Sequence, residues 1–314
     1  MFDEVTLSFR AMNTDVEAVV CVPAEERPSA DRALGQVHRL FEEIEETLSR
    51  FSPGSELSRL NASAGQPFTA SPMLFKAVKA SLGAARVTGG LFDPTVLAAL
   101  IEAGYDRSFE ELTDRGKAVP APHAKCGWTW KDIRLDNGSS LICLPAGCAL
   151  DLGGIGKGWA VDRAARRLQE FRGYAVDAGG DMMVGGCRAD GSAWTVGVAD
   201  PLKPDHDLMV LELDRGAVCT SSTTRRRWSA GGESRHHLID PRTGQPSQSG
   251  IAAATVTADS AARAETITKA AIMLGPKAGL KFIERQSGVE GVLVLSNGTL
   301  RMSRKFKGVP GVAA

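Results

Sequence analysis

The sequence predicts an α+β (mixed α/β) fold. Segments in which apolar and polar residues alternate, as in strands, are interspersed with segments that repeat apolar residues at helical spacing. Because the two kinds do not alternate strictly along the chain, we expect a mixed architecture. The chain has 314 residues, of which 43% are hydrophobic and 24% charged, so it is long enough to bury a large core.

No internal repeat and no linker-like composition divides the chain. The loop at residues 115–126, which contains Pro120 and Pro122, is the best candidate for a break between domains. The length alone allows one or two domains; because no linker divides the chain, we expect residues 1–314 to form a single unit.

The first half of the chain is expected to contain strands near its start, two helices and a hairpin. Residues 4–22 alternate as strands do, with an interruption at residues 12–15. Apolar stripes predict helices over about 31–48, capped by Ser29 or Asp31, and over about 72–87. The turn signal at residues 136–138 predicts a hairpin within residues 132–151.

The second half is expected to be richer in strands. Residues 194–199 and 208–213 have strand patterns, and a hairpin should turn at Asn297-Gly298. A helix is expected over about 260–274, begun by Asp259 or Ser260 and ended by Gly275-Pro276, with a shorter helix after it.

Charge and cysteine usage narrow the class of protein. The 37 basic and 37 acidic residues give a net charge of zero, so we expect no nucleic-acid partner. No apolar run approaches the roughly 20 residues that span a bilayer. The first residues are acidic and lack the pattern of a signal peptide, so we expect a cytoplasmic protein. The six cysteines are scattered, which favours buried free thiols over a metal site or disulfides.

Two glycine-rich turns are the most informative motifs. The first, Asp151-Leu-Gly-Gly-Ile-Gly-Lys-Gly158, leads directly into a helical stripe formed by Trp159, Ala165, Leu168 and Phe171, and the second is Asp177-Ala-Gly-Gly-Asp181. A glycine-rich turn that opens a helix leaves backbone N–H groups free for an anion, usually a phosphate. Lys157 adds a positive charge there. The alternative is a pair of tight turns without a ligand.

Four other segments place polar residues where a packed core would not need them. Asp93 comes just after the predicted end of a helix, and its carboxylate has two possible roles: to bind a ligand or to cap the next segment. Residues 219–224 are rich in hydroxyl groups and precede Arg225-Arg-Arg227. Hydroxyl and guanidinium groups suit the binding of phosphate oxygens, and the alternative is a solvated loop. His236 and His237 are adjacent, and either is a candidate general base or a structural residue. Glu265 and Lys269 have the spacing of a plain surface ion pair on a helix.

Taken together, these blocks resemble the ApbE family, the FAD:protein FMN transferases. The resemblance runs from Met12 to the final hairpin. The blocks occur in the order of the family: Met12-Asn-Thr, residues 55–61, Leu91-Phe-Asp-Pro-Thr95, Asp151 to Gly158, Gly179-Gly-Asp181, Thr220-Ser221, His237 to Gly244, and Ala264 to Ala270.

The resemblance implies a fold and a reaction. FAD would bind in a central cleft between two lobes of one α+β unit. The enzyme would cleave FAD, move FMN onto a Ser or Thr hydroxyl of a target protein and release AMP. Acceptor segments look like Asp-Gly-x-Thr-Ser-Gly, and none is evident in this chain, so we do not expect it to flavinylate itself.

The resemblance also implies site residues. His237 would be the base for the incoming hydroxyl or would orient it, and Asp181, in the second glycine-rich turn, is the other catalytic candidate. The implied FAD-binding residues are Met12, Phe51, Leu91, Phe92, Asp93, Asp151, Lys157, Gly179, Gly180, Ser221 and His237. Phe51 takes a place often held by Tyr, which keeps the ring and loses the hydroxyl.

The implied metal site departs from the usual pattern. In the family a divalent metal, usually magnesium, bridges to the pyrophosphate, and an Ala-Asp-x-x-x-Thr-Ala block supplies its oxygens. Here Glu265 replaces the Asp and Lys269 replaces the Thr, while Gly154 and Ala262 match the remaining metal positions. Glu265 keeps a hard oxygen donor, but Lys269 is not expected to coordinate because an ammonium has no acceptor.

Three functions remain open at this point. The first is a working FAD:protein FMN transferase, with either a relocated metal or Lys269 as an electrostatic substitute for it, which the retained His237 and Asp181 favour. The second is an FAD-binding protein without transferase activity, which the changes at Glu265 and Lys269 favour. The third is a metal-dependent FAD pyrophosphatase that releases AMP and FMN.

Overall fold

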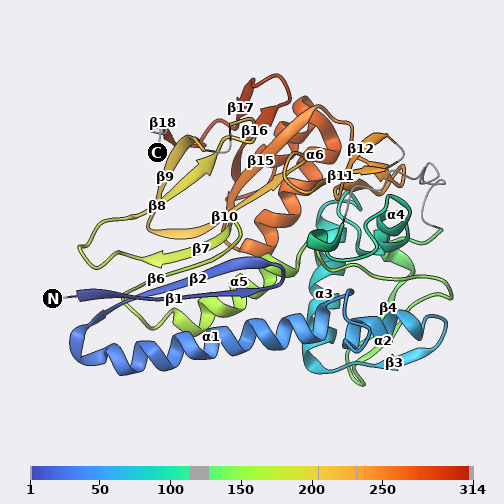
Figure 1. Ribbon diagram of the computed structural model, residues 1–314, viewed down its shortest axis with the longest axis horizontal. Helices are drawn as coiled ribbons and strands as arrows, with labels where there is room; N and C mark the ends of the chain where they lie inside the picture. The colour runs from blue at the N-terminus through green and yellow to red at the C-terminus, as the bar shows by residue number, and fades with distance from the viewer. Residues whose placement is uncertain (1, 113–126, 204, 231, 311–314) are drawn as a thin grey trace.

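A computed structural model describes residues 2–112, 127–203, 205–230 and 232–310 of the chain. Figure 1 shows a large sheet flanked by long helices, and beside it a smaller region of short helices and strands. This arrangement confirms the α+β prediction. The candidate break at residues 115–126 lies outside the described residues.

The helices are α1 (Arg27–Leu48), α2 (Glu56–Ala62), α3 (Pro72–Val87), α4 (Leu97–Glu102), α5 (Gly156–Leu168) and α6 (Ala261–Glu284). The strands of the first half are β1 (Phe2–Ala11), β2 (Thr14–Pro23), β3 (Pro67–Thr69), β4 (Arg134–Asp136) and β5 (Leu141–Cys143). The middle strands are β6 (Gly173–Ala178), β7 (Asp181–Gly186), β8 (Trp194–Ala199), β9 (Asp207–Leu213), β10 (Arg215–Ser222), β11 (Arg227–Ala230) and β12 (Glu233–His236). The last strands are β13 (Ile239–Asp240), β14 (Gln245–Pro246), β15 (Ile251–Ala258), β16 (Glu290–Leu295), β17 (Leu300–Met302) and β18 (Val309–Pro310).

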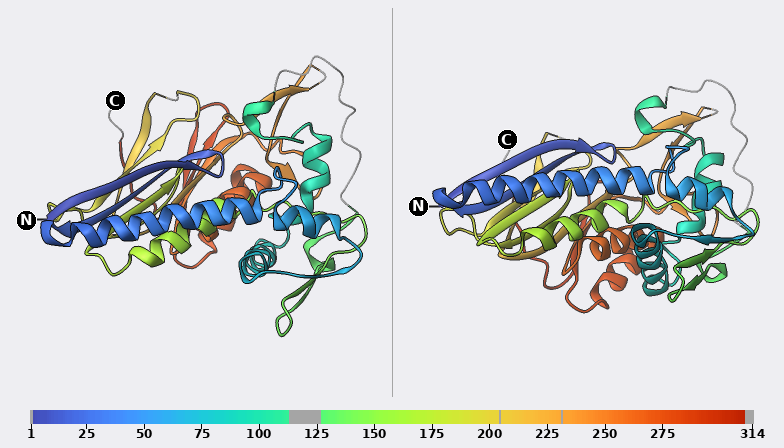
Figure 2. Two further views of the ribbon diagram at one scale, coloured as in Figure 1. Left: turned by 60° about the horizontal axis from the view of Figure 1, so that its bottom comes forward. Right: turned by 90° about the horizontal axis from the view of Figure 1, so that it is seen from below.

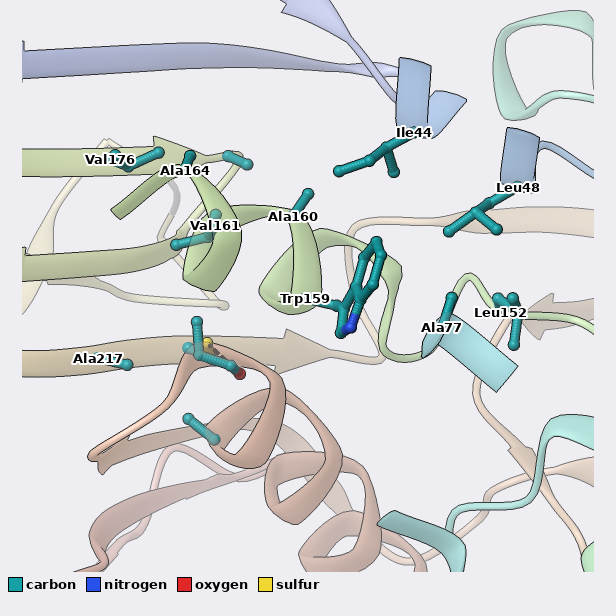
Figure 3. Packing of buried hydrophobic residues seen from close by; sticks show 14 of the residues in the cluster. Ile44, Leu48, Ala77, Leu152, Trp159, Ala160, Val161, Ala164, Val176 and Ala217 are labelled. Carbon is teal, nitrogen blue, oxygen red and sulfur yellow. Dashed lines mark hydrogen bonds between the residues drawn. The ribbon is translucent and has the colours of Figure 1, made fainter. Parts of the chain in front are cut away.

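The largest sheet of the described residues has eight strands in the order β1-β2-β6-β7-β10-β15-β16-β17. Every neighbouring pair in it is antiparallel. Helices α1, α5 and α6 cover one face, as Figure 2 shows. In the core, Trp159, Ala160 and Val161 of α5 lie between the sheet and the end of α1, where Ile44 and Leu48 point toward them (Figure 3).

The opposite face of the large sheet is covered by a three-stranded sheet in the order β18-β9-β8. Val196 and Leu211 from this sheet pack against Val218 and Val292 of the large one. A sheet that is buried on both faces needs apolar residues on both sides of a strand. Accordingly, seven of the eight residues of β15 are buried, and they form an almost continuous apolar run.

The smaller region contains α2, α3, α4 and the three-stranded sheet β3-β5-β4. Trp228 of β11 joins it to the rest of the protein. Its indole packs with Leu100 and Tyr105, and its Nε1 donates a hydrogen bond of 2.8 Å to the carbonyl of Ala103. This contact fixes the β11–β12 hairpin against α4.

Most of the predicted elements are confirmed, and two details are wrong. Neither Ser29 nor Asp31 caps α1, which begins at Arg27 because Pro28 is well tolerated in a first turn. The helix α5 ends at Leu168, so Phe171 lies beyond it. The helix expected over about 260–274 and the shorter helix after it are both confirmed. They meet at a kink at Gly275, whose φ of 79° and ψ of 175° are not helical, and together they carry the label α6. Within the described part of the chain, no helix combines the length and the apolar character needed to cross a membrane.

Candidate active site

A cleft lies where the two regions meet, and segments from both regions line it. They are the β1–β2 turn, the end of α1 with the loop after it, the segment before α4, α4 itself with Tyr105 after it, the glycine-rich turn before α5, Arg226, the residues around β13, and α6. The structure thus brings ten of the predicted site residues to one cleft: Met12, Phe51, Leu91, Phe92, Asp93, Asp151, Gly154, Lys157, His237 and Lys269.

Met12 reaches the cleft through an unfavourable backbone conformation. Met12 and Asn13 form the β1–β2 turn with φ values of 51° and 61°, in the left-handed region that favours glycine. A left-handed residue other than glycine costs about 1–2 kcal/mol. Residues in such strained conformations persist only where the surrounding structure holds them in place, and they are common at functional sites. Here the paired strands β1 and β2 hold the turn, and both side chains line the cleft.

One wall of the cleft is built on Arg50, which the sequence patterns did not single out. Its guanidinium lies 4.1 Å from the centre of the Phe51 ring and 4.7 Å from that of Tyr105. Its Nε lies 2.6 Å from Asp151 Oδ2, and its Nη2 donates to the Tyr105 carbonyl at 2.9 Å. Asp151 in turn accepts from the N–H of Gly153 at 2.9 Å. Arg50 therefore ties the glycine-rich turn to the smaller region.

An aromatic column continues this wall. The Phe51 and Tyr105 rings are 5.7 Å apart, and Tyr105 stacks on Trp228 at 5.4 Å. Phe51 stands at the exposed end of the column with 37% of its surface accessible. An exposed aromatic ring at the rim of a cleft offers a stacking surface to a flat ligand.

Asp93 has the capping role that the sequence allowed. Its Oδ1 accepts from the backbone N–H of Thr95 at 3.0 Å and from the Thr95 hydroxyl at 2.8 Å, and its Oδ2 accepts from Trp130 N–H at 3.1 Å. Burial raises the pKa of Asp93, although these hydrogen bonds oppose the rise. Asp93 also lines the cleft.

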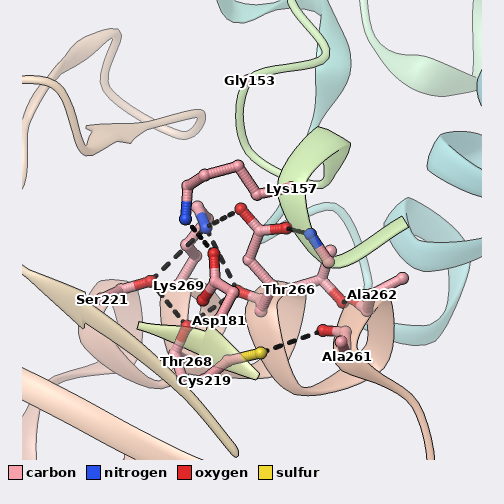
Figure 4. Close-up of polar contacts among 12 residues, drawn as sticks. Gly153, Lys157, Asp181, Cys219, Ser221, Ala261, Ala262, Thr266, Thr268 and Lys269 are labelled. Carbon is pink, nitrogen blue, oxygen red and sulfur yellow. Dashed lines mark hydrogen bonds and ion pairs between the residues drawn. The ribbon is translucent and has the colours of Figure 1, made fainter. Parts of the chain in front are cut away.

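Lys157 and Asp181 form a buried ion pair at the floor of the cleft (Figure 4). Lys157 stands in the first turn of α5, and Asp181 opens β7 and is only 1% exposed. Burial alone would lower the pKa of Lys157, but the carboxylates of Asp181 and Glu265 outweigh it and raise the pKa. The ammonium therefore stays charged at neutral pH.

The interpretation of Glu265 and Lys269 as a surface ion pair is wrong. Their side chains are 1% and 12% exposed, and Lys269 Nζ lies 3.1 Å from Glu265 Oε1. The other carboxylate oxygen, Oε2, accepts from the N–H of Gly158 at 2.9 Å. Lys269 also donates to Ser221 Oγ at 3.4 Å (Figure 4). Periodicity cannot reveal this burial, because α5 and β10, which cover the pair, are distant in sequence.

The structure separates the two adjacent histidines, since neighbouring residues of an extended chain point to opposite sides. His236 Nε2 lies 2.9 Å from the Ser247 carbonyl, and its Nδ1 accepts from Leu238 N–H at 3.2 Å, so it is a structural residue. His237 lines the cleft, and its buried Nδ1 has no hydrogen-bond partner. Burial lowers the pKa of His237 well below the usual value, and the charges of Arg226 and Lys269 lower it further.

Six predicted site residues lie outside the lining of the cleft. Asp181, Ser221 and Glu265 support lysines that do line it. Gly179 and Gly180 form the β6–β7 turn with φ values of 64° and 88°, and a side chain at Gly179 would collide with the Thr14 hydroxyl. This turn accounts for both glycines without a ligand. Ala262 is the sixth of these residues: its N–H donates to Asp162 at 3.1 Å, and its carbonyl accepts from Thr266 Oγ1 at 3.0 Å.

The residues at the implied metal positions do not fit a divalent cation. Both oxygens of Glu265 already accept hydrogen bonds, and the Lys269 ammonium lies where a cation would meet Oε1. The Ala262 carbonyl is engaged by Thr266. In residues 2–112, 127–203, 205–230 and 232–310, no group of three or more His, Cys, Asp or Glu side chains could hold a metal ion.

The fold and the cleft define a class of site. Cationic side chains (Arg50, Lys157, Arg226 and Lys269), exposed aromatic surface and a neutral buried histidine suit a flat ligand that carries phosphate groups. Sequence patterns identified Arg226 only as part of a basic run and missed Arg50 and Tyr105. The one signal for Arg50 was its position directly before Phe51, and Tyr105 had none.

Comparison with known proteins assigns the family. A profile of the ApbE family matches residues 12–293, and the chain belongs to this family. An FAD:protein FMN transferase of Chlamydia trachomatis is 30% identical over 249 residues, covering 76% of this chain and 75% of that protein. The ApbE protein of Thermotoga maritima has a similar crystal structure, with 26% sequence identity and a TM-score of 0.83. The match covers 97% of this chain and 98% of that chain. The flavinyl transferase ApbE of Pseudomonas stutzeri, in its apo form, is 25% identical in sequence and has a TM-score of 0.80. The match covers 96% of this chain and 95% of that chain.

Proposed function

We propose that this protein is an FAD:protein FMN transferase. It cleaves FAD, moves FMN onto a Ser or Thr hydroxyl of a target protein and releases AMP. The observation that carries the proposal is the neutral His237 imidazole, which shares one cleft with the cations of Arg226, Lys157 and Lys269. Family membership and the name of the Chlamydia trachomatis relative support it.

The cleft residues divide the work of binding FAD. The pyrophosphate carries negative charge and meets Lys157, Lys269 and Arg226. A flat ring of the ligand stacks on the exposed face of Phe51. The remaining contacts come from Met12, Leu91, Phe92, Asp93, Asp151 and the backbone of the glycine-rich turn. Gly179, Gly180 and Ser221 contribute indirectly, through the turn and through Lys269.

His237 acts as the general base in the transfer. The hydroxyl oxygen of the target attacks the phosphorus of the FMN half of FAD and forms the new P–O bond. The bond from that phosphorus to the bridging oxygen breaks, and AMP leaves with the electron pair. The hydroxyl proton passes to the imidazole of His237, which can accept it because its low pKa keeps it neutral. Asp181 positions the Lys157 ammonium beside the leaving phosphate.

We further propose that residues 1–314 act as one unit, because the cleft needs both Met12 and Lys269. A reducing compartment such as the cytoplasm suits the free thiols of Cys21, Cys143, Cys187 and Cys219. Magnesium belongs to the resemblance, but the residues at its positions do not fit it. No step above passes through a metal.

The test is intact-mass spectrometry of a target domain with an Asp-Gly-x-Thr-Ser-Gly-like segment after incubation with FAD and this protein. We expect the mass of one FMN, less water, on the target, and an equal amount of AMP. His237→Ala should abolish transfer and keep FAD binding, whereas His206→Ala, at an exposed position, should change neither. AMP and FMN without a mass gain would indicate a pyrophosphatase. Bound FAD without cleavage would indicate an FAD-binding protein.

A further inference from the structure

Four buried side chains form a charge-balanced group at the floor of the cleft. We call this group the Lys–carboxylate quartet; it consists of Lys157, Lys269, Asp181 and Glu265. Two ammonium groups face two carboxylates, so the formal charges cancel. The carboxylates are each 1% exposed, and the lysines, at 18% and 12%, reach the cleft. In the absence of Lys269, the same group would carry one net negative charge and would attract a cation.

The quartet leaves no vacant oxygen on Glu265 for a metal ion. Gly158 N–H donates to Oε2 at 2.9 Å, and Lys269 Nζ lies 3.1 Å from Oε1. A divalent ion at Oε1 would have to displace the ammonium and then remain beside it. Like charges at such distances repel strongly where burial reduces screening by water.

The ammonium of Lys269 is held in place on several sides. Its Nζ contacts the Glu265 carbonyl at 3.3 Å and Ser221 Oγ at 3.4 Å, and Ser221 bonds to Thr268 at 2.7 Å. The glycine-rich turn closes over the stem of the side chain. A Cβ at Gly154 would lie 3.5 Å from Lys269 Cε and 2.8 Å from the Phe92 ring. The short distance to the Phe92 ring is what favours glycine here, while the distance to Lys269 is an ordinary van der Waals contact.

We propose that the Lys269 ammonium takes the place of a divalent cation, so that the cleft binds the pyrophosphate of FAD without magnesium. The ammonium donates hydrogen bonds to the phosphate oxygens. Together with Lys157 it offsets the negative charge of the ligand. The FMN transfer proposed above then also proceeds without metal, and this second statement rests on the proposed function.

The first experiment measures FAD binding by quenching of flavin fluorescence, in EDTA and in millimolar MgCl2. We expect the Kd of the wild-type protein to agree within twofold in the two buffers. Mn²⁺ titration followed by electron paramagnetic resonance should show no stoichiometric site. Loss of FAD binding in EDTA with recovery in MgCl2, or one tightly bound Mn²⁺, would overturn the proposal.

Variants test Lys269 itself. Lys269→Met should weaken FAD binding at least tenfold in both buffers, and Lys277→Met, at an exposed position of α6, should leave it unchanged. The double variant Glu265→Gln/Lys269→Met removes both charges of the pair and guards against misfolding of the single variant. It should bind FAD as weakly as Lys269→Met. An unchanged Kd in a folded variant would show that the ammonium does not hold the pyrophosphate.

A third variant restores the residue types of the usual metal block. Glu265→Asp/Lys269→Thr should bind FAD poorly in EDTA and recover at least tenfold in MgCl2. Equal binding in both buffers would contradict the substitution of ammonium for metal. Transfer is scored separately by intact mass. Absence of transfer in either buffer, with metal-independent FAD binding retained, would refute the proposed function and support the role of Lys269.

Discussion

Gly158 stands at the closest approach of α5 and α6, and the substitution Gly158→Ala tests how the site is held. A Cβ there would lie 2.6 Å from the carbonyl carbon and oxygen of Ala261 and 2.7 Å from the nitrogen of Ala262. All three are backbone atoms, so no side chain can turn away to make room. The two helices would have to separate, and with them the Gly158 N–H and Glu265 Oε2, which are 2.9 Å apart.

The expected magnitude follows from three contributions. Replacing a helical glycine by alanine gains about 1 kcal/mol in intrinsic propensity. Overpacking costs about 1–3 kcal/mol, and weakening a hydrogen bond to a buried carboxylate costs about 1.5–3 kcal/mol. The Gly158→Ala protein should therefore be less stable by about 1.5–5 kcal/mol. Lys157 moves with α5, so the affinity for FAD should also fall.

Gly83 provides the matched control. It lies on the exposed side of α3, and a Cβ there would meet no atom within 4 Å. Gly83→Ala should stabilise the protein by about 0.5–1 kcal/mol. The assay is urea denaturation followed by tryptophan fluorescence. If the two variants have the same free energy of unfolding, close packing at Gly158 is not what positions α5 against α6.

Three further predictions concern charge. Burial raises the pKa of Asp177 to about 6, so the folded state holds this proton more tightly than the unfolded state, and ionisation at neutral pH opposes folding. Asp177→Asn should add about 1–2 kcal/mol of stability in urea denaturation at pH 7.5, a gain that shrinks toward pH 4. Because the pKa of His237 is low, the transfer rate should stay level from pH 8 to pH 6; a fall centred near 6.5 would contradict this. Arg50→Ala leaves the Asp151 carboxylate without its cation and should cost about 2–4 kcal/mol of stability and roughly tenfold in FAD affinity, measured by denaturation and fluorescence quenching.

Local chemistry made some elements predictable. The helix over residues 72–87 has the predicted bounds, because Ser71 caps its start and its apolar stripe is regular. The hairpin at Asn297-Gly298 turns where it was predicted to turn. Such turns are predictable because the conformational preferences of a few adjacent residues determine them. Ten site residues fell into one cleft because their motifs are short and contiguous.

Long-range contacts were not predictable in the same way. Arg50 bonds to Tyr105 across 55 positions, and Trp228 bonds to Ala103 across 125. Nothing in the spacing of one sequence links such partners. For Glu265, the helical spacing to Lys269 was visible, but its burial depends on Gly158, which is 107 positions away. The sequence pattern therefore predicted the ion pair correctly, but it did not predict that the pair is buried.

The order of strands in the large sheet has a consequence for biosynthesis. Strand β2, near the start of the chain, pairs with β6, where Val16 lies opposite Ala178, and the cleft joins Met12 to Lys269. A nascent chain therefore has no complete ligand site until α6 has left the ribosome. Because a ligand that binds only the folded state adds stability in proportion to the logarithm of its concentration, FAD can stabilise only finished molecules. Flavin supply in the cell would then influence how much of the completed protein survives proteolysis.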